Sequence, residues 1–440
     1  MKKFKVCLAV LMVAMMMGGS AWAFNATDHV KVAPNGKGDL LIFPYYFAYP
    51  GDYSTKITVI NTSSTHSVVA KVVYRTFNWS YEVLDHLIFL SPNDVWTGKL
   101  VNVAGVARLQ STDDSILGRM PSGTAFAADS DFGNVTPVDQ PLVAAYCPTE
   151  DSNTNGYIEV IEAASRLESQ ATTGYAPGQR VAKRHIYDWY YNYVTDFTIQ
   201  NGPYSPVNVL TGYQENTFGM GATLKQANVF ADYFNFSKLE LSRQTILGEN
   251  ANNSLAEVEA AMGKLNLSIP YIAKSNGDSS VHIFNFPTKY SLLNPASTCT
   301  NYRINDRSPY WILVNSKCET YTRNIYDLLE NSPTDTTDPF SPPKNPSQLK
   351  MCGEVEFNVQ GSSNPMYTEG WIRYIHGKSA AIKSGITNSG NPITYTGIPV
   401  LTSVLYWSAA RANPAEANVA YTDGAVSVTS INQPYYQYSE

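Results

Sequence analysis

Residues 55–76 read TKITVINTSSTHSVVAKVVYRT, two alternating runs on either side of a cluster of turn-forming residues. In the first run Ile57 and Val59 fall on one face and Lys56 on the other. Alternation with period two is typical of a half-buried strand, and the Asn-Thr-Ser-Ser sequence at 61–64 is typical of a turn. The stretch therefore predicts two strands joined by a turn.

Short strand-like runs recur on both sides of this stretch, separated by turn signals. They lie at residues 40–43, 87–90, 95–97 and 157–161, and strand-like sequence returns from 400 to 438. Short strands at such close spacing predict an all-β fold, mainly antiparallel and β-sandwich-like, with a porin-like outer-membrane β-barrel as the alternative.

One short helix is expected, over residues 254–264. Ser254 and Glu257 have the spacing of a capping box, and alanine-rich sequence follows as far as Gly263. The aromatic-dense segment 187–199 is interpreted instead as a strand, because aromatic side chains are common in sheets.

The N-terminus has the pattern of a secretory signal peptide. Three lysines in the first five residues precede an apolar run at 6–17, and Ala21-Trp22-Ala23 has the small-x-small pattern that signal peptidase cleaves. The apolar run is too short to span a bilayer, and the sequence holds no second long apolar run. We therefore expect an exported protein, located in the outer membrane or at the cell surface.

The composition excludes some classes of partner. Charged residues make up 15% of the chain, against about 25% in an average soluble domain, and the net charge is -6 with no basic block. The 30 tyrosines, 7 tryptophans and 17 phenylalanines favour β structure or contact with a membrane interface. Nucleic-acid binding has no electrostatic footprint here, and nucleotide binding lacks a P-loop or GxGxxG cradle, so no nucleic acid, nucleotide or organic cofactor is expected.

The organisation expected from these signals has five parts. After the signal peptide at 1–23 come an N-terminal β domain at 24–140 and a central β-rich region at 141–331. A proline-rich linker or loop at 332–347 precedes a C-terminal β region at 348–440.

Four cysteines follow the signal peptide: Cys147, Cys299, Cys318 and Cys352. An even count in an exported chain predicts two disulfides, with three possible pairings. Cys299 with Cys318 is the preferred local pair, which leaves Cys147 with Cys352; alternatively one or both pairs stay reduced. The sequence has no CxxC motif, so redox catalysis and haem attachment lack their signatures.

Residues 151–162 match the spacing D-x-[DN]-x-[DN]-G-x5-E of a calcium loop. Calcium takes six to eight oxygen ligands. The candidate ligands are Asp151, Asn153, Asn155, the carbonyl of Tyr157, and Glu162. The alternative is a polar hairpin turn before a strand, with Glu159 and Glu162 on opposite faces.

No catalytic residue is expected. The sequence has neither HExxH nor GxSxG, and Glu159, Glu162 and Glu369 are acid–base candidates by residue type alone. The basic residues from Arg180 to His185 could stack on a sugar or contact lipid head groups; the alternative is a solvated turn before a strand.

Six motifs occur in one order: GKGDLLIFPYY at 36–46, NT at 61–62, LSPNDVWTG at 90–98, STDDS at 111–115, GYIEVIE at 156–162 and FPTK at 286–289. Together they resemble an uncharacterised family of exported proteobacterial cell-surface proteins. In that family a cysteine often follows the Ser115 position, where this chain has Ile116. The resemblance implies a cell-surface location and assigns no catalytic residue.

The overall character is also similar to the OmpJ family of proposed outer-membrane channel proteins of metal-reducing bacteria. Signal length, size, tyrosine content and low charge carry this looser similarity. It implies an outer-membrane location and indirect support of extracellular electron transfer, with outer-surface cytochromes as indirect partners.

Together these observations predict a non-enzymatic, exported cell-envelope protein of a Gram-negative bacterium. Its role would be structural or interactive, with outer-membrane or cell-surface components as partners; the alternative is a porin-like channel. Four aromatic residues, Tyr45, Tyr46, Trp96 and Trp189, are expected either in contact surfaces or in the core.

Overall fold

The fold is given by a computed structural model that describes part of the chain. The described residues are 31–32, 37–51, 53–77, 80, 82–116, 138–143, 152–168, 180–193, 206–218, 222–227, 229–232, 262–264, 266–272, 279–287, 293–294, 303–304, 319–328, 348–351, 355–360, 369–376, 381–386, 392–396, 398–407 and 425–430.

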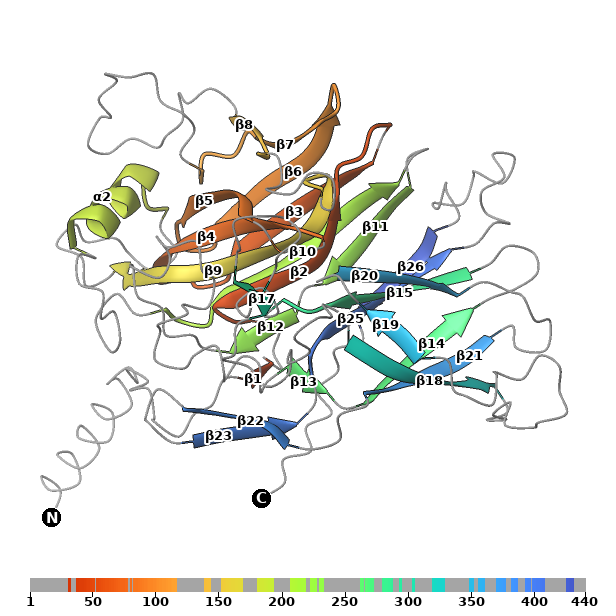
Figure 1. The fold of residues 1–440 in the computed structure, drawn as a ribbon. Helices are drawn as coiled ribbons and strands as arrows, with labels where there is room; N and C mark the ends of the chain where they lie inside the picture. The colour runs from red at the N-terminus through yellow and green to blue at the C-terminus, as the bar shows by residue number, and fades with distance from the viewer. Residues whose placement is uncertain are drawn as a thin grey trace, which may run out of the picture.

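Two six-stranded antiparallel sheets form the larger sandwich (Figure 1). Sheet I has the order β1 (Lys31–Val32), β12 (Val229–Asp232), β2 (Leu40–Phe47), β9 (Asn155–Leu167), β4 (His66–Thr76), β5 (Glu82–Leu90). Sheet II has the order β11 (Ala222–Ala227), β10 (Leu210–Phe218), β3 (Ser54–Asn61), β6 (Val95–Val103), β7 (Val106–Ser111), β8 (Val138–Pro141). Both sheets are open among the described residues, with β1 and β5, and β11 and β8, at their edges.

The core of this sandwich follows from the alternation in the sequence. Ile57 and Val59 of β3 face Val68 and Tyr74 of β4 in one buried cluster that also holds Trp96. Successive side chains of a strand point to opposite faces, so one alternating run supplies one inner face of the sandwich. The all-β, sandwich-like fold is therefore confirmed.

Two four-stranded sheets form a second, smaller sandwich. Sheet III has the order β14 (Asn266–Ile272), β21 (Glu369–His376), β18 (Glu319–Asp327), β19 (Gln348–Met351), and sheet IV has the order β20 (Val355–Gln360), β15 (Ser279–Asn285), β25 (Leu401–Trp407), β26 (Ala425–Ser430). Phe284 of sheet IV packs edge-on against Tyr374 of sheet III. Three two-stranded pairs complete the strands: β13 (Gly263–Lys264) with β24 (Ile398–Pro399), β16 (Leu293–Asn294) with β17 (Arg303–Ile304), and β22 (Ala381–Ile386) with β23 (Pro392–Thr396).

The helix α2 (Lys183–Tyr193) lies where a strand was expected, so that prediction is wrong for 187–193; residues 194–199 lie outside the described part. Ile186, Trp189 and Tyr190 are buried, and their spacing of three and four is the helical one. Tyr190 packs edge-on against Phe89 of β5. Burial of this stripe against sheet I outweighs the strand preference of aromatic residues.

The helix expected over residues 254–264 does not extend to its predicted C-terminal end at Lys264. Residues 254–261 lie outside the described part, and Gly263–Lys264 form β13, which pairs with Ile398–Pro399. Pairing with β24 sets an extended backbone at these two residues.

The strands do not follow the boundary expected at residue 140. β9 lies between β2 and β4 in sheet I, and β10 lies beside β3 in sheet II. Residues 1–23 and 332–347 lie outside the described part, so the signal peptide and the linker stay predictions. No described helix is long and apolar enough to cross a membrane.

Candidate functional site

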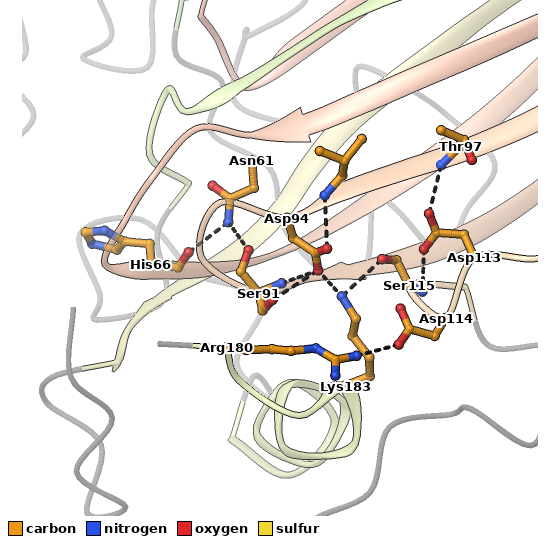
Figure 2. A network of polar contacts seen from close by, with 11 residues as sticks. Asn61, His66, Ser91, Asp94, Thr97, Asp113, Asp114, Ser115, Arg180 and Lys183 are labelled. Atoms are coloured by element: carbon orange, nitrogen blue, oxygen red, sulfur yellow. Dashed lines mark hydrogen bonds and ion pairs between the residues drawn. The ribbon is translucent and has the colours of Figure 1, made fainter. Parts of the chain in front are cut away.

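A connected polar cluster of the larger sandwich surrounds Lys183 at the start of α2 (Figure 2). Its ammonium forms an ion pair with the Oδ2 atom of Asp94, in the turn between β5 and β6, and lies 3.0 Å from the Oγ atom of Ser115. The Lys183 side chain is 1% exposed. Three segments far apart in sequence are thus joined through one buried cation.

The Asp94 carboxylate is held in place by the turn around it. Oδ2 accepts hydrogen bonds from the backbone nitrogen and the hydroxyl of Ser91, at 2.9 and 3.1 Å, and Oδ1 accepts one from the nitrogen of Val95. Asn61 donates to the carbonyl oxygens of His66 and Ser91, which joins this turn to the one between β3 and β4. The carboxylate is therefore oriented before it meets Lys183.

Opposing effects act on the charge of Lys183. Burial lowers the pKa of its ammonium to about 7, while the adjacent Asp94 carboxylate favours the charged form. A serine beside a lysine of lowered pKa is also the pair that some hydrolases use for nucleophilic catalysis. Ser115, however, is 0% exposed, and its backbone oxygen accepts a hydrogen bond from Phe89. We therefore assign a structural role to the cluster: it holds α2 against the sandwich.

The neighbouring basic residues take different positions. Arg180 is largely exposed and pairs with Asp114, with Nη2 and Oδ2 2.7 Å apart. Arg184 pairs with Asp188 within the helix. Both interpretations of this basic segment, contact with a sugar or lipid head group and a solvated turn, required an exposed Lys183. The buried position of Lys183 agrees with neither.

A second polar cluster lies on the face of sheet I that points away from the larger core. Nε of Arg75 on β4 lies 2.9 Å from Oε2 of Glu159 on β9, and both side chains are almost fully buried. Burial raises the pKa of Glu159 to about 7, and Arg75 acts against this rise. Lys71 pairs with Asp85 on the same face, at 2.8 Å.

This face also meets the smaller sandwich. The hydroxyl of Tyr157 on β9 donates to the hydroxyl of Ser80, at 2.8 Å, and lies 3.4 Å from the carbonyl oxygen of Pro287. The amide of Asn285 at the end of β15 donates to the carbonyl of Pro44 in β2. The Arg75–Glu159 cluster therefore lies close to the junction of the two sandwiches.

The candidate calcium ligands are not brought together. Asp151 lies outside the described residues, and the segment from Asn155 through Glu162 is part of the continuous strand β9. At about 3.3 Å per residue, Glu162 lies about 20 Å along the strand from Gly156. The amide of Asn153 donates to the carbonyls of Leu142 and Val143. The arrangement is the alternative one, a polar turn followed by a strand.

Glu162 instead belongs to a buried acidic pair. Its side chain is 0% exposed, and its Oε1 accepts a hydrogen bond from the backbone nitrogen of Val207. Burial and the nearby Asp39 raise its pKa well above the ordinary value. Within the described part of the chain, no group of three or more His, Cys, Asp or Glu side chains is placed to hold a metal ion.

The remaining expected residues are placed as follows. All four candidate disulfide cysteines lie outside the described residues, so their pairing stays a prediction. The aromatic residues left open between contact surface and core, Tyr45, Tyr46, Trp96 and Trp189, are all buried.

Exposed apolar side chains gather at one end of sheet II. Of the six large hydrophobic side chains exposed among the described residues, four lie there: Tyr53 at 37%, Val103 at 44%, Val106 at 40% and Val143 at 59%. Tyr53 directly precedes β3, Val103 and Val106 close the β6–β7 hairpin, and Val143 follows β8. The sequence did not predict this surface. Single valines at strand ends carry no signal, and only the register of the strands shows that these ends lie side by side.

Comparisons of the chain with protein-family models, with curated proteins and with solved structures found no match. The two resemblances noted from the sequence therefore remain expectations.

Proposed function

We propose that this protein is an exported, non-enzymatic component of a Gram-negative cell envelope, and that it acts at the outer membrane or cell surface by contact. The observation that carries the proposal is the gathering of exposed apolar side chains at one end of sheet II. Exposed apolar side chains that gather on one part of a surface are typical of sites that contact a protein or a membrane. The N-terminal pattern of a signal peptide supports the location.

The polar clusters support a scaffold role. Lys183–Asp94 joins α2 to the sandwich, and the Arg75–Glu159 cluster lies near the contacts between the two sandwiches. Buried ion pairs contribute little net stability, and we infer that these two fix the arrangement of the elements they join, which suits a protein that presents a fixed surface.

Cell fractionation tests this proposal. The chain should be found with outer membranes, and its release by salt or chelator, together with its gel mobility before and after boiling, should show how it is held there. Release by mild washing without a mobility shift would support a peripheral contact protein. A large mobility shift would favour the channel alternative, and a chain found only in the cytoplasm would exclude the proposal.

An indirect role in extracellular electron transfer follows only if the chain helps to place outer-surface cytochromes. Deletion of the gene should then change the outer-membrane protein profile and slow the reduction of insoluble metal oxide. If neither changes, this part of the proposal fails while the envelope location stands.

A further inference from the structure

The β6–β7 hairpin ends in an apolar tip of four consecutive exposed residues. Val103 pairs with Val106 across a two-residue turn, in which Ala104 has a φ of 52° and Gly105 a φ of 87°. Positive φ at both central residues is typical of the type I′ turn that joins two strands tightly. All four residues, Val103 to Val106, are exposed. An exposed apolar run of this length is unfavourable in water unless it serves a function.

The sequence around the tip is free of charge over eight residues. Residues 100–107 read LVNVAGVA, and Lys99 and Arg108 flank them on the two strands. Lys99 is exposed, and Arg108 is partly exposed and pairs with Asp139 of β8. Four residues separate Lys99 from the turn and two separate Arg108 from it, which correspond to about 13 Å and about 7 Å along the two strands. Long cationic side chains flanking an apolar element are a pattern of proteins that dip into a bilayer surface.

Tyrosines stand beside the base of the tip. The amide of Asn102 on β6 donates to the carbonyl of Ala48, at 3.0 Å, which ties the hairpin to the segment between β2 and β3. That segment carries Tyr49 and Tyr53, whose rings meet edge-on at 6.0 Å. Tyrosine is enriched at the boundary between hydrocarbon and water, because its ring is apolar and its hydroxyl is hydrated.

We propose that this tip, formed by Val103, Ala104, Gly105 and Val106 with Tyr49 and Tyr53 beside it, inserts into the surface of a lipid bilayer. The inference deepens the proposed function and rests on it, since it names the contact partner as lipid. Figure 1 shows the β6–β7 hairpin extending to the margin of the molecule, away from the smaller sandwich.

The size and shape of the tip favour lipid over a protein partner. A stable protein interface usually takes about 20 to 30 residues a side, with aromatic or arginine side chains at its centre. Here the centre is two valines, an alanine and a glycine on a turn. Small aliphatic side chains on a narrow hairpin suit shallow insertion, in which binding strengthens with the apolar area that enters the bilayer.

Co-sedimentation with vesicles tests the inference. The full exported chain, purified from the producing cells, is mixed with vesicles of phosphatidylethanolamine and phosphatidylglycerol. The wild-type chain should sediment with the vesicles, and the double variant Val103→Ser/Val106→Ser should bind on the order of a hundredfold more weakly, because four methyl groups leave the tip. Val95→Ser is the matched control: Val95 lies on the same strand with 40% exposure, but at its other end.

Unchanged thermal unfolding of all three chains shows that the fold is intact. The inference is overturned if the wild-type chain does not sediment with vesicles, if the double variant binds as well as wild type, or if Val95→Ser weakens binding equally. If the chain fractionates with the envelope but does not bind vesicles, the proposed function stands and the lipid inference fails. A chain absent from the envelope would remove both.

Discussion

Lys183 of α2 and Asp94 of the β5–β6 turn, 89 positions apart in the chain, form a buried ion pair that attaches the helix of the larger sandwich to sheet I. The attachment combines this charge contact with the packing of Tyr187 and Tyr190 on Phe89. Because packing and charge act at the same place, removal of either should loosen the helix.

Loss of the Lys183 ammonium should be costly. Lys183→Met leaves the Asp94 carboxylate without its cation, and we expect the free energy of unfolding to fall by about 3 kcal/mol. Arg180→Met is the matched control on the same segment: its pair with Asp114 is largely exposed, so the change should be within about 1 kcal/mol. Urea unfolding of both variants measures the difference, and equal effects would contradict a structural role for Lys183.

Acid should destabilise the smaller sandwich through His282. Its Nε2 lies 3.0 Å from the carbonyl of Pro270 and its Nδ1 lies 2.7 Å from the hydroxyl of Tyr374, so the neutral ring donates to one and accepts from the other. Burial lowers its pKa to about 3. Between pH 6.5 and about 3 the unfolded chain binds a proton that the folded ring does not, so stability falls as the pH falls.

The variant His282→Gln isolates this effect. It should reduce the dependence of the unfolding free energy on pH by about 1.4 kcal/mol per pH unit below pH 6. Both chains retain the contribution of Glu159, whose raised pKa acts in the opposite direction, so the difference between their pH profiles removes it. A variant with the same pH profile as wild type would show that His282 is not buried as a neutral ring.

Glu162→Gln should stabilise the protein at pH 7. The amide removes a carboxyl group whose charged form is disfavoured by burial and by Asp39, and its oxygen can still accept the hydrogen bond from Val207. The measurement is the thermal midpoint with and without calcium. If calcium raises the midpoint of wild type and Glu162→Gln abolishes that rise, the calcium loop first expected at 151–162 is restored and the strand geometry of β9 is contradicted.

Ala104→Asn should stabilise the β6–β7 hairpin by about 1 kcal/mol. Ala104 has a positive φ, which an L-residue with a β-carbon adopts at a cost, whereas Asn-Gly is the preferred sequence of a type I′ turn. Gly105→Ala is the opposite test, since it adds a β-carbon at a φ of 87° and should lower the unfolding midpoint. A midpoint that moves the same way in both variants would argue against this turn type.

The strands were predictable because their signal is local. Alternation in 55–60 and 67–76 corresponds to β3 and β4, whose inner faces the structure confirms. Such a pattern is imposed by a sheet that buries one face, and it is visible without knowledge of the partner strand.

The helix α2 and the charge clusters were not predictable in the same way. In α2 the residues that favour strands also occur at helical spacing, and contact with Phe89 decides between the two. Arg75 and Glu159 lie 84 positions apart, so no local pattern connects them. The calcium motif shows the converse: residues 151–162 have the spacing of a binding loop, but pairing with β2 and β4 makes most of it a strand.

The pairing of Lys31 in β1 with Asp232 in β12 forms one edge of sheet I from residues about 200 positions apart. A ribosome delivers the N-terminal strands first, and β2 has neither of its neighbours, β9 and β12, until those later segments emerge. Strand edges that wait for late partners can pair with other chains. The strand order therefore makes the incomplete chain prone to aggregation. A holding chaperone would be most useful before residue 232 has emerged.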